Sequence, residues 1–125
     1  MVIASILLAL VGLIAVMSGL LLLAAPGRAA ATLGFGSLDS LADGYARFSG
    51  VRNFVAGALL LALAYAFGVT HTAGLALFLV GAIAWGVTQL ADAAIFLRLG
   101  SRSGALSAGA LALILVVAAL LAWIG

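Results

Sequence analysis

The sequence predicts an all-α integral membrane protein: four spans form an antiparallel helix bundle, with a short interfacial helix between the first two. Three observations support this fold class. Of the 125 residues, 68% are hydrophobic and 6% are charged. A soluble domain carries roughly a quarter charged residues, so this chain could not cover its own surface in water. The apolar residues also gather into four runs separated by short polar connections, and at this length the chain forms one domain over residues 1–125.

The composition also limits the function classes. The formal charge is +2, but the five basic residues are scattered arginines with no basic run and no interleaved aromatic residues. We therefore expect the lipid bilayer, and not nucleic acid, as a partner. The chain has no cysteine, which excludes a catalytic thiolate and a cysteine metal site, and the sequence shows no sign of another metal site or a cofactor. Abundant alanine, glycine, leucine and arginine without lysine or glutamate are typical of a GC-rich bacterial genome, so the expected location is the bacterial inner (plasma) membrane.

The first span covers about residues 2–25. At about 1.5 Å per residue it exceeds the roughly 30 Å hydrocarbon core and can cross it with some tilt. No Lys or Arg precedes the run, and it is longer than the apolar part of a signal peptide, so we expect a retained helix. Pro26 and Gly27 end it. Small residues form a stripe on this helix, made of Ser5, Ala9, Gly12 and Gly19. Such a stripe lets a second helix pack closely, and it could also serve as a homodimer interface.

Residues 27–49 are the only sizeable polar stretch. Ser37 is a candidate N-cap, and apolar residues recur at helical spacing after it, from Leu38 to Phe48. This pattern predicts a short amphipathic helix that lies in the membrane interface and leads into the second span. An ordinary connecting loop is the alternative.

The remaining spans are expected at about 49–68, 75–98 and 104–124. The turns VTHTAG (69–74) and GSRS (100–103) connect them. Connections this short force antiparallel neighbours, which predicts the bundle.

Arginine placement predicts the orientation. The first and third connections contain or adjoin arginines, whereas the second connection and both termini have none. The positive-inside rule then places connections one and three in the cytoplasm and both termini outside. Aromatic residues suit the two interfaces: Tyr45 and Phe48 at the inner one, and Tyr65, Phe67 and Trp123 at the outer one.

Arg52 and Asp92 are the most informative residues, because a charge inside a membrane span is costly and normally has a partner and a function. Arg52 lies five residues beyond Arg47, and Asp92 lies six residues before Arg98. If the two flanking arginines mark the inner interface, these distances correspond to depths of about 7.5 and about 9 Å. The matched depths predict a buried ion pair between spans two and three, in the cytoplasmic half of the membrane.

Other polar residues lie at similar depth, and all four spans contribute to this layer. Asn53 follows Arg52, and Gln89 shares a helix face with Asp92 one turn away. Asp92 is the candidate catalytic residue. The predicted ligand-binding residues are Arg52, Asn53, Trp85, Gln89, Asp92 and Ser107, with Ser18 entering from the first span.

Several interpretations of this layer stay open. The ion pair could only fix helix register, the layer could form a pocket open to the cytoplasm or inner leaflet, or Arg52 could extend to lipid headgroups without meeting Asp92. A pocket would bind a small anionic or amphiphilic ligand, with Arg52 as the anion partner. One alternative is a membrane-embedded enzyme, an isomerase or hydrolase for a lipid-soluble substrate, with Asp92 as general acid/base. A small-solute transporter ranks below both, because the outer half offers no polar path.

Two short motifs carry a family resemblance: GVRNFVAG at 50–57, followed by a leucine/alanine run, and QLADAA at 89–94. With the four-span layout, they resemble the small four-helix DoxX-like membrane proteins of unknown function. The resemblance implies a four-span fold with Arg in span two and Asp in span three. Members often carry a His near the start of span four, where this chain reads Ala105-Leu106-Ser107. Any chemistry of that His would be missing here, and the resemblance implies no reaction.

Overall fold

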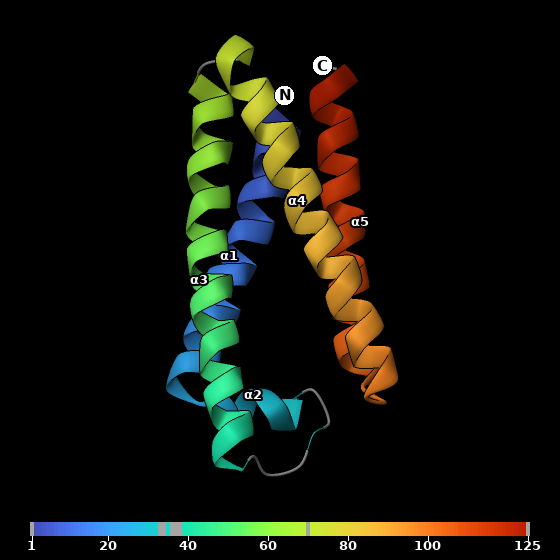
Figure 1. Ribbon diagram of the computed structural model, residues 1–125. Helices are drawn as coiled ribbons and strands as arrows, with labels where there is room; N and C mark the ends of the chain where they lie inside the picture. Colours follow the sequence, from blue (N-terminus) through green and yellow to red (C-terminus); the bar gives the residue numbers. More distant parts are fainter. Residues whose placement is uncertain (1, 33–34, 36–38, 70, 125) are drawn as a thin grey trace.

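The computed structural model describes residues 2–32, 35, 39–69 and 71–124, and these contain five helices (Figure 1). They are α1 (Val2–Ala24), α2 (Pro26–Thr32), α3 (Ser40–Val69), α4 (His71–Arg98) and α5 (Arg102–Ile124). Four of them are long and apolar enough to cross a membrane, with candidate spans at Val2–Ala24, Ala42–Phe67, Gly74–Arg98 and Arg102–Ile124. The predicted all-α, four-span fold is confirmed, and the chain is an integral membrane protein.

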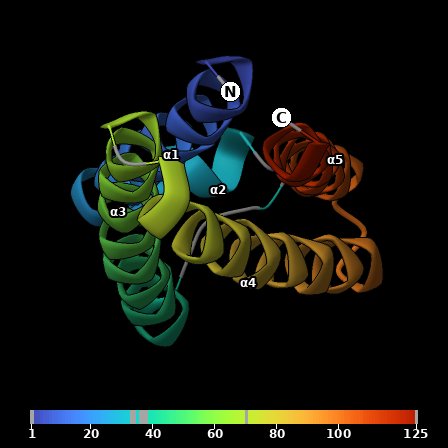
Figure 2. The same ribbon diagram turned by 90° about the horizontal axis from the view of Figure 1, so that it is seen from above.

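The long helices run antiparallel, so Val2 and Ile124 lie at the same end of the bundle (Figure 1). We call this the terminal end, and we call the opposite end, with α2 and the α4–α5 turn, the connection end. α1 packs against α3 and α4 packs against α5, while contacts between α3 and α4 and between α1 and α5 join the two pairs. From the short connection between them, α3 and α4 diverge towards the connection end (Figures 1 and 2).

The apolar core lies in the terminal half, where all four long helices meet. Phe67 and Phe78 are fully buried, with ring centroids 4.6 Å apart. Phe67 is therefore a core residue and not the interfacial aromatic that the sequence suggested, because α3 turns that side towards α4. Lipid is as apolar as these side chains, so close packing holds this core together. Other large members are Leu8, Val11, Leu60 and Leu115.

Two reciprocal glycine contacts bring α1 and α3 together. A Cβ at Gly12 would lie 2.9 Å from the Gly57 carbonyl oxygen, and a Cβ at Gly57 would lie 2.6 Å from that of Gly12. Gly19 and Gly50 repeat the arrangement at 2.6 and 2.8 Å, two helical turns away. The predicted groove on the first span is thus present, and α3 fills it. This small-residue face, which the sequence also offered to a homodimer, is used within the chain.

A short helix lies between the first two spans, but at a different place from the one expected. It is α2, with Pro26 at its first position, where no intrahelical hydrogen bond is lost. Residues 40–48 instead extend α3, because no proline separates them from the second span. Asp39 caps α3: its Oδ1 accepts the Ala42 N–H at 2.7 Å. The expected cap, Ser37, lies outside the described residues.

The α4–α5 turn confirms the one expected at GSRS. Gly100 has a φ of 80°, a conformation that side chains with a Cβ rarely adopt. The Ser101 N–H donates to the Phe96 carbonyl at 2.9 Å, and the Gly100 N–H donates to the Leu97 carbonyl at 3.2 Å, which is a Schellman motif. Ser101 Oγ then accepts the Gly104 N–H at 3.2 Å and caps α5.

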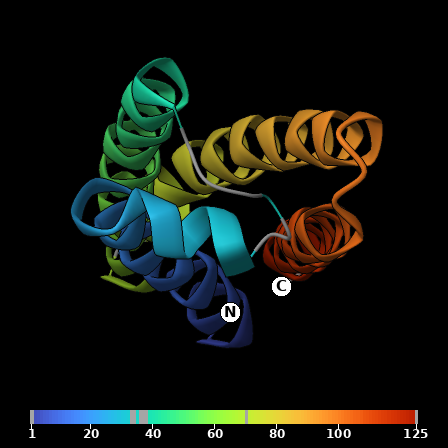
Figure 3. The ribbon, with the colours of Figure 1, turned by 90° about the horizontal axis from the view of Figure 1, so that it is seen from below.

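α2 lies across the connection end and points from α1 towards α5 (Figure 3). The Ser103 hydroxyl donates to the Thr32 carbonyl at 3.5 Å. Phe35 stacks on Phe96, with ring centroids 6.3 Å apart. These contacts rejoin the two helix pairs beyond the point where α3 and α4 have diverged.

Candidate functional site

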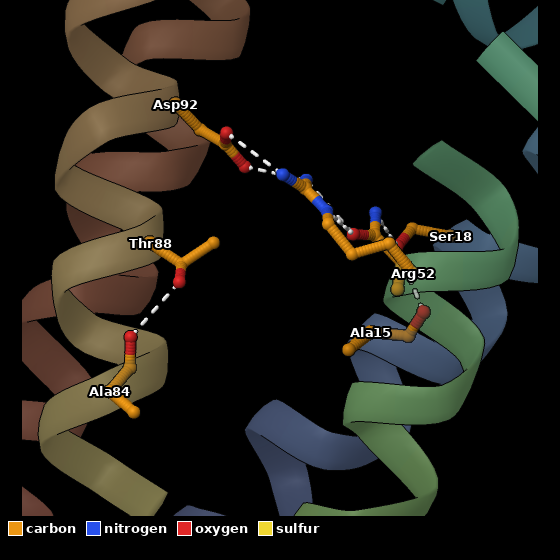
Figure 4. Close-up of polar contacts among 7 residues, drawn as sticks. Ala15, Ser18, Arg52, Ala84, Thr88 and Asp92 are labelled. Atoms are coloured by element: carbon orange, nitrogen blue, oxygen red, sulfur yellow. Dashed lines mark hydrogen bonds and ion pairs between the residues drawn. The ribbon is translucent and has the colours of Figure 1, made fainter. Parts of the chain in front are cut away.

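An ion pair bridges the diverging helices α3 and α4 (Figure 4). Arg52 Nη2 lies 3.0 Å from Asp92 Oδ2, and Nη1 lies 3.5 Å from Oδ1. Two near-parallel contacts of this kind match the planar guanidinium to the carboxylate. The pairing that the matched depths predicted is therefore present.

Asn53 connects this pair to α1. Its Oδ1 accepts hydrogen bonds from Arg52 Nε at 3.2 Å and from Nη2 at 3.1 Å. Its Nδ2 donates to Ser18 Oγ at 3.3 Å, and the Ser18 hydroxyl donates to the Ala15 carbonyl at 3.0 Å. The network thus crosses from α4 through α3 to α1 (Figure 4). Such networks hold each member in one orientation, which orients the guanidinium towards α4.

Trp85 and Gln89 lie on the α4 face that carries Asp92, closer to the terminal end. The Arg52 Cζ atom lies 5.7 Å from the Trp85 ring centroid, within cation–π range. Trp85 is 7% exposed and Gln89 is 6% exposed. The Trp85 Nε1–H has no acceptor among the described residues. Among the described residues, no hydrogen bond joins the Gln89 amide to the ion pair.

The ion pair is open on one side. The Arg52 side chain is 40% exposed and that of Asp92 is 19% exposed. This differs from the buried pair that the sequence predicted, because the divergence of α3 and α4 leaves the bridge uncovered. A shallow, open apolar groove of about 420 Å³ lies on the exposed face of α3 beside Arg52, and all of its lining residues belong to this helix. Its other lining residues are Phe48, Val51, Val55, Ala56 and Leu59.

Ser107 lies apart from the other five predicted residues. It is exposed on α5, and within the described part of the chain no polar contact joins it to Arg52 or Asp92. Its depth along the fourth span predicted that Ser107 would lie in the polar layer. The rotation of α5 about its own axis instead turns this side chain outward. The described residues also contain no cluster of three or more side chains that could hold a metal ion.

Sequence reasoning missed a second structural role among the arginines. Arg47 served only as a marker of the interface. Its Nε lies 2.9 Å from Asp43 Oδ2, and its Nη1 donates to the Leu23 carbonyl at 2.6 Å. Arg47 thereby satisfies a carbonyl in the last turn of α1, where a cation is also favoured by the helix dipole. The i, i+4 spacing to Asp43 was the available signal.

The arrangement places an ion pair without net charge beside an apolar groove. Arg52 uses four of its five N–H groups on Asn53 and Asp92. Polar groups at the edge of an apolar groove can fix the head of an amphiphile while its apolar part lies along α3.

A comparison with protein families matches residues 12–124 to a domain of unknown function, DUF4267. The match covers most of the chain and includes every element of the site. The chain belongs to the DUF4267 family. Neither the curated proteins nor the solved structures gave a significant match. The resemblance of this DUF4267 chain to DoxX-like proteins stays a prediction, and the family assigns no activity to Arg52 or Asp92.

Proposed function

We propose that this DUF4267 protein binds a small anionic or amphiphilic ligand at the Arg52–Asp92 pair, and that the ligand enters from the bilayer between α3 and α4. The observation that carries the proposal is an ion pair within two candidate spans whose Arg52 side chain stays 40% exposed. A charged side chain costs about 2.5–3.5 kcal/mol at the centre of a spanning helix and less near the interface. A polar group that covers the exposed side of the pair is therefore favoured there.

The surroundings support a ligand with an apolar part. The groove beside Arg52 is lined by apolar side chains of α3. Both members of the pair lie within candidate spans, between helices that diverge towards the connection end (Figures 1 and 2). This position supports entry from the side, through lipid.

Ligand binding can be tested with oleate as the probe and the protein in phosphatidylcholine nanodiscs. Calorimetric titration should show saturable binding to the wild type and its loss in Arg52→Gln. Arg98→Gln is the matched control, because it removes one exposed arginine outside the site. If both variants bind oleate equally weakly, general electrostatic attraction explains the binding. If neither oleate nor uncharged amphiphiles bind to the wild type, the proposal is rejected.

Asp92→Asn separates this proposal from the two alternatives. An enzyme that uses Asp92 as general acid/base would lose turnover of a lipid-soluble substrate while the variant stays folded. A proton-coupled transporter would lose proton-dependent uptake into liposomes. A binding protein would keep a folded, ligand-binding site with altered ligand preference.

We also propose that the connection end faces the cytoplasm of a bacterial cell and that both termini lie outside. All five arginines belong to the half of the bundle near the connection end. The positive-inside rule supports this orientation.

A further inference from the structure

We infer that the ligand of this site carries no net charge. The inference rests on the proposed function and specifies the class of amphiphile. It begins from the charge balance: Arg52 and Asp92 neutralise each other through contacts of 3.0 and 3.5 Å. Among the described residues, neither forms a second ion pair. The site is electrically neutral before any ligand arrives.

A charged headgroup would disturb this balance. An anion at Arg52 must displace the Asp92 carboxylate or lie beside it, where like charges repel. A cation at Asp92 meets the same difficulty from Arg52. Both effects are stronger in the low-dielectric surroundings of a membrane span than in water. A headgroup without net charge leaves the pair intact.

The unused hydrogen-bonding capacity fits an uncharged hydroxyl or carbonyl. Arg52 makes four hydrogen bonds, which leaves one of its N–H groups for an acceptor oxygen. The Asp92 carboxylate can accept further hydrogen bonds, for example from a ligand hydroxyl. One hydroxyl can therefore accept from Arg52 and donate to Asp92 without breaking the ion pair.

The groove can hold part of one acyl chain. Its lining runs along α3 from Phe48 to Leu59, and Arg52 lies within it. At about 1.5 Å per residue, the stretch from Arg52 to Leu59 is about 10.5 Å long, about a third of the roughly 30 Å hydrocarbon core. An amphiphile with its head at Arg52 can place the first part of one chain along this face of α3.

Tryptophan fluorescence can rank the candidate ligands. The chain has two tryptophans, so Trp123→Phe leaves Trp85, beside Arg52, as the reporter. In nanodiscs, this variant is titrated with four amphiphiles that share an oleyl or oleoyl chain. They are monooleoylglycerol (uncharged), oleoyl-lysophosphatidylcholine (zwitterionic), oleate (anionic) and oleyltrimethylammonium (cationic). Trp85→Phe, in which only Trp123 emits, controls for non-specific insertion.

We expect monooleoylglycerol to bind at least about tenfold more tightly than oleate or the cationic amphiphile, a difference of about one decade in Kd. If lysophosphatidylcholine binds as tightly as monooleoylglycerol, the ligand carries no net charge and its headgroup can be zwitterionic. If lysophosphatidylcholine binds more weakly than monooleoylglycerol, the ligand headgroup is uncharged. This ranking needs no substitution in the ion pair, so it remains decisive if the pair variants fail to fold.

Charge variants add a directional test. Asp92→Asn gives the site a charge of +1 and should shift the preference to oleate, whereas Arg52→Gln should shift it to the cationic amphiphile. Asp39→Asn changes the charge equally at an exposed residue outside the site and should leave the ranking unchanged. If oleate binds best to the wild type and Arg52→Gln abolishes it, the inference is overturned but the proposed function stands. If none of the four binds, both are rejected.

Discussion

At the scale of single residues, Arg52 and Asp92 show why matched depth is informative. Arg52 is five residues from Arg47, Asp92 is six residues from Arg98, and the two side chains meet at 3.0 Å. Counting residues suffices for this because rise per residue is fixed in a helix. It could not reveal that the pair is uncovered, since that depends on how α3 and α4 diverge.

A double-mutant cycle should show coupling between the two charges. Arg52→Gln or Asp92→Asn alone leaves the other charge unpaired, so each should destabilise the protein, and the double variant should lose less than the sum. We expect an interaction energy of about 0.5–3 kcal/mol, measured by SDS-induced unfolding followed by circular dichroism. Simple additivity of the two losses would show that the pair contributes no stability.

Trp85 should tolerate loss of its N–H group. Its Nε1–H lacks an acceptor among the described residues, and an unsatisfied buried donor is destabilising by about 1–3 kcal/mol. Trp85→Phe keeps a ring under Arg52 and should be as stable as the wild type or slightly more so, whereas Trp85→Ala should lose stability. The same unfolding assay measures both. A clear loss of stability in the Phe variant would indicate that the indole N–H has a partner in the membrane.

At the scale of elements, most helices could be predicted because apolar runs set their length. The exceptions are α2, which lies at Pro26–Thr32 where the short helix was expected after Ser37, and α3, which begins at Ser40 and not at about 49. Its polar first turns lack the hydropathy of a span, but nothing in the sequence breaks the helix before the apolar part. Ser107 illustrates the other limit, because helix rotation about its own axis depends on packing partners that depth does not specify.

The α1–α3 contact gives a matched pair of substitutions. A Cβ at Gly57 would lie 2.6 Å from backbone atoms of α1, whereas a Cβ at Gly109 would meet nothing within 4 Å. Gly57→Ala should therefore destabilise the protein by about 1–3 kcal/mol through overpacking. Gly109→Ala should be neutral or stabilising, because alanine is the better helix former. Equal effects of the two in SDS unfolding would contradict the close glycine packing.

At the scale of the whole molecule, the two halves of the bundle differ. The terminal half holds the apolar core, and the half near the connection end holds every charged residue. The sequence indicated this asymmetry because arginine and aspartate positions can be assigned to span ends directly. The splay of the helix pairs could not be predicted, since it arises from side-chain packing between elements distant in the sequence.

Cysteine labelling tests the proposed orientation. The chain has no cysteine, so each introduced one is unique. A membrane-impermeant maleimide added to intact cells should label Trp123→Cys at the terminal end and should not label Ser103→Cys at the connection end until the cells are permeabilised. The reverse pattern would place the arginines outside and overturn the proposed orientation.

The open side of the Arg52–Asp92 pair lies between two spanning helices, and α2 crosses the nearer end of the bundle. If a ligand binds there by the proposed lateral route, it must first dissolve in the membrane. Its occupancy would then follow its mole fraction among the lipids and not its aqueous concentration. Adding lipid while the amount of ligand stays constant would lower the mole fraction of ligand and empty the site. The protein would therefore respond to membrane composition.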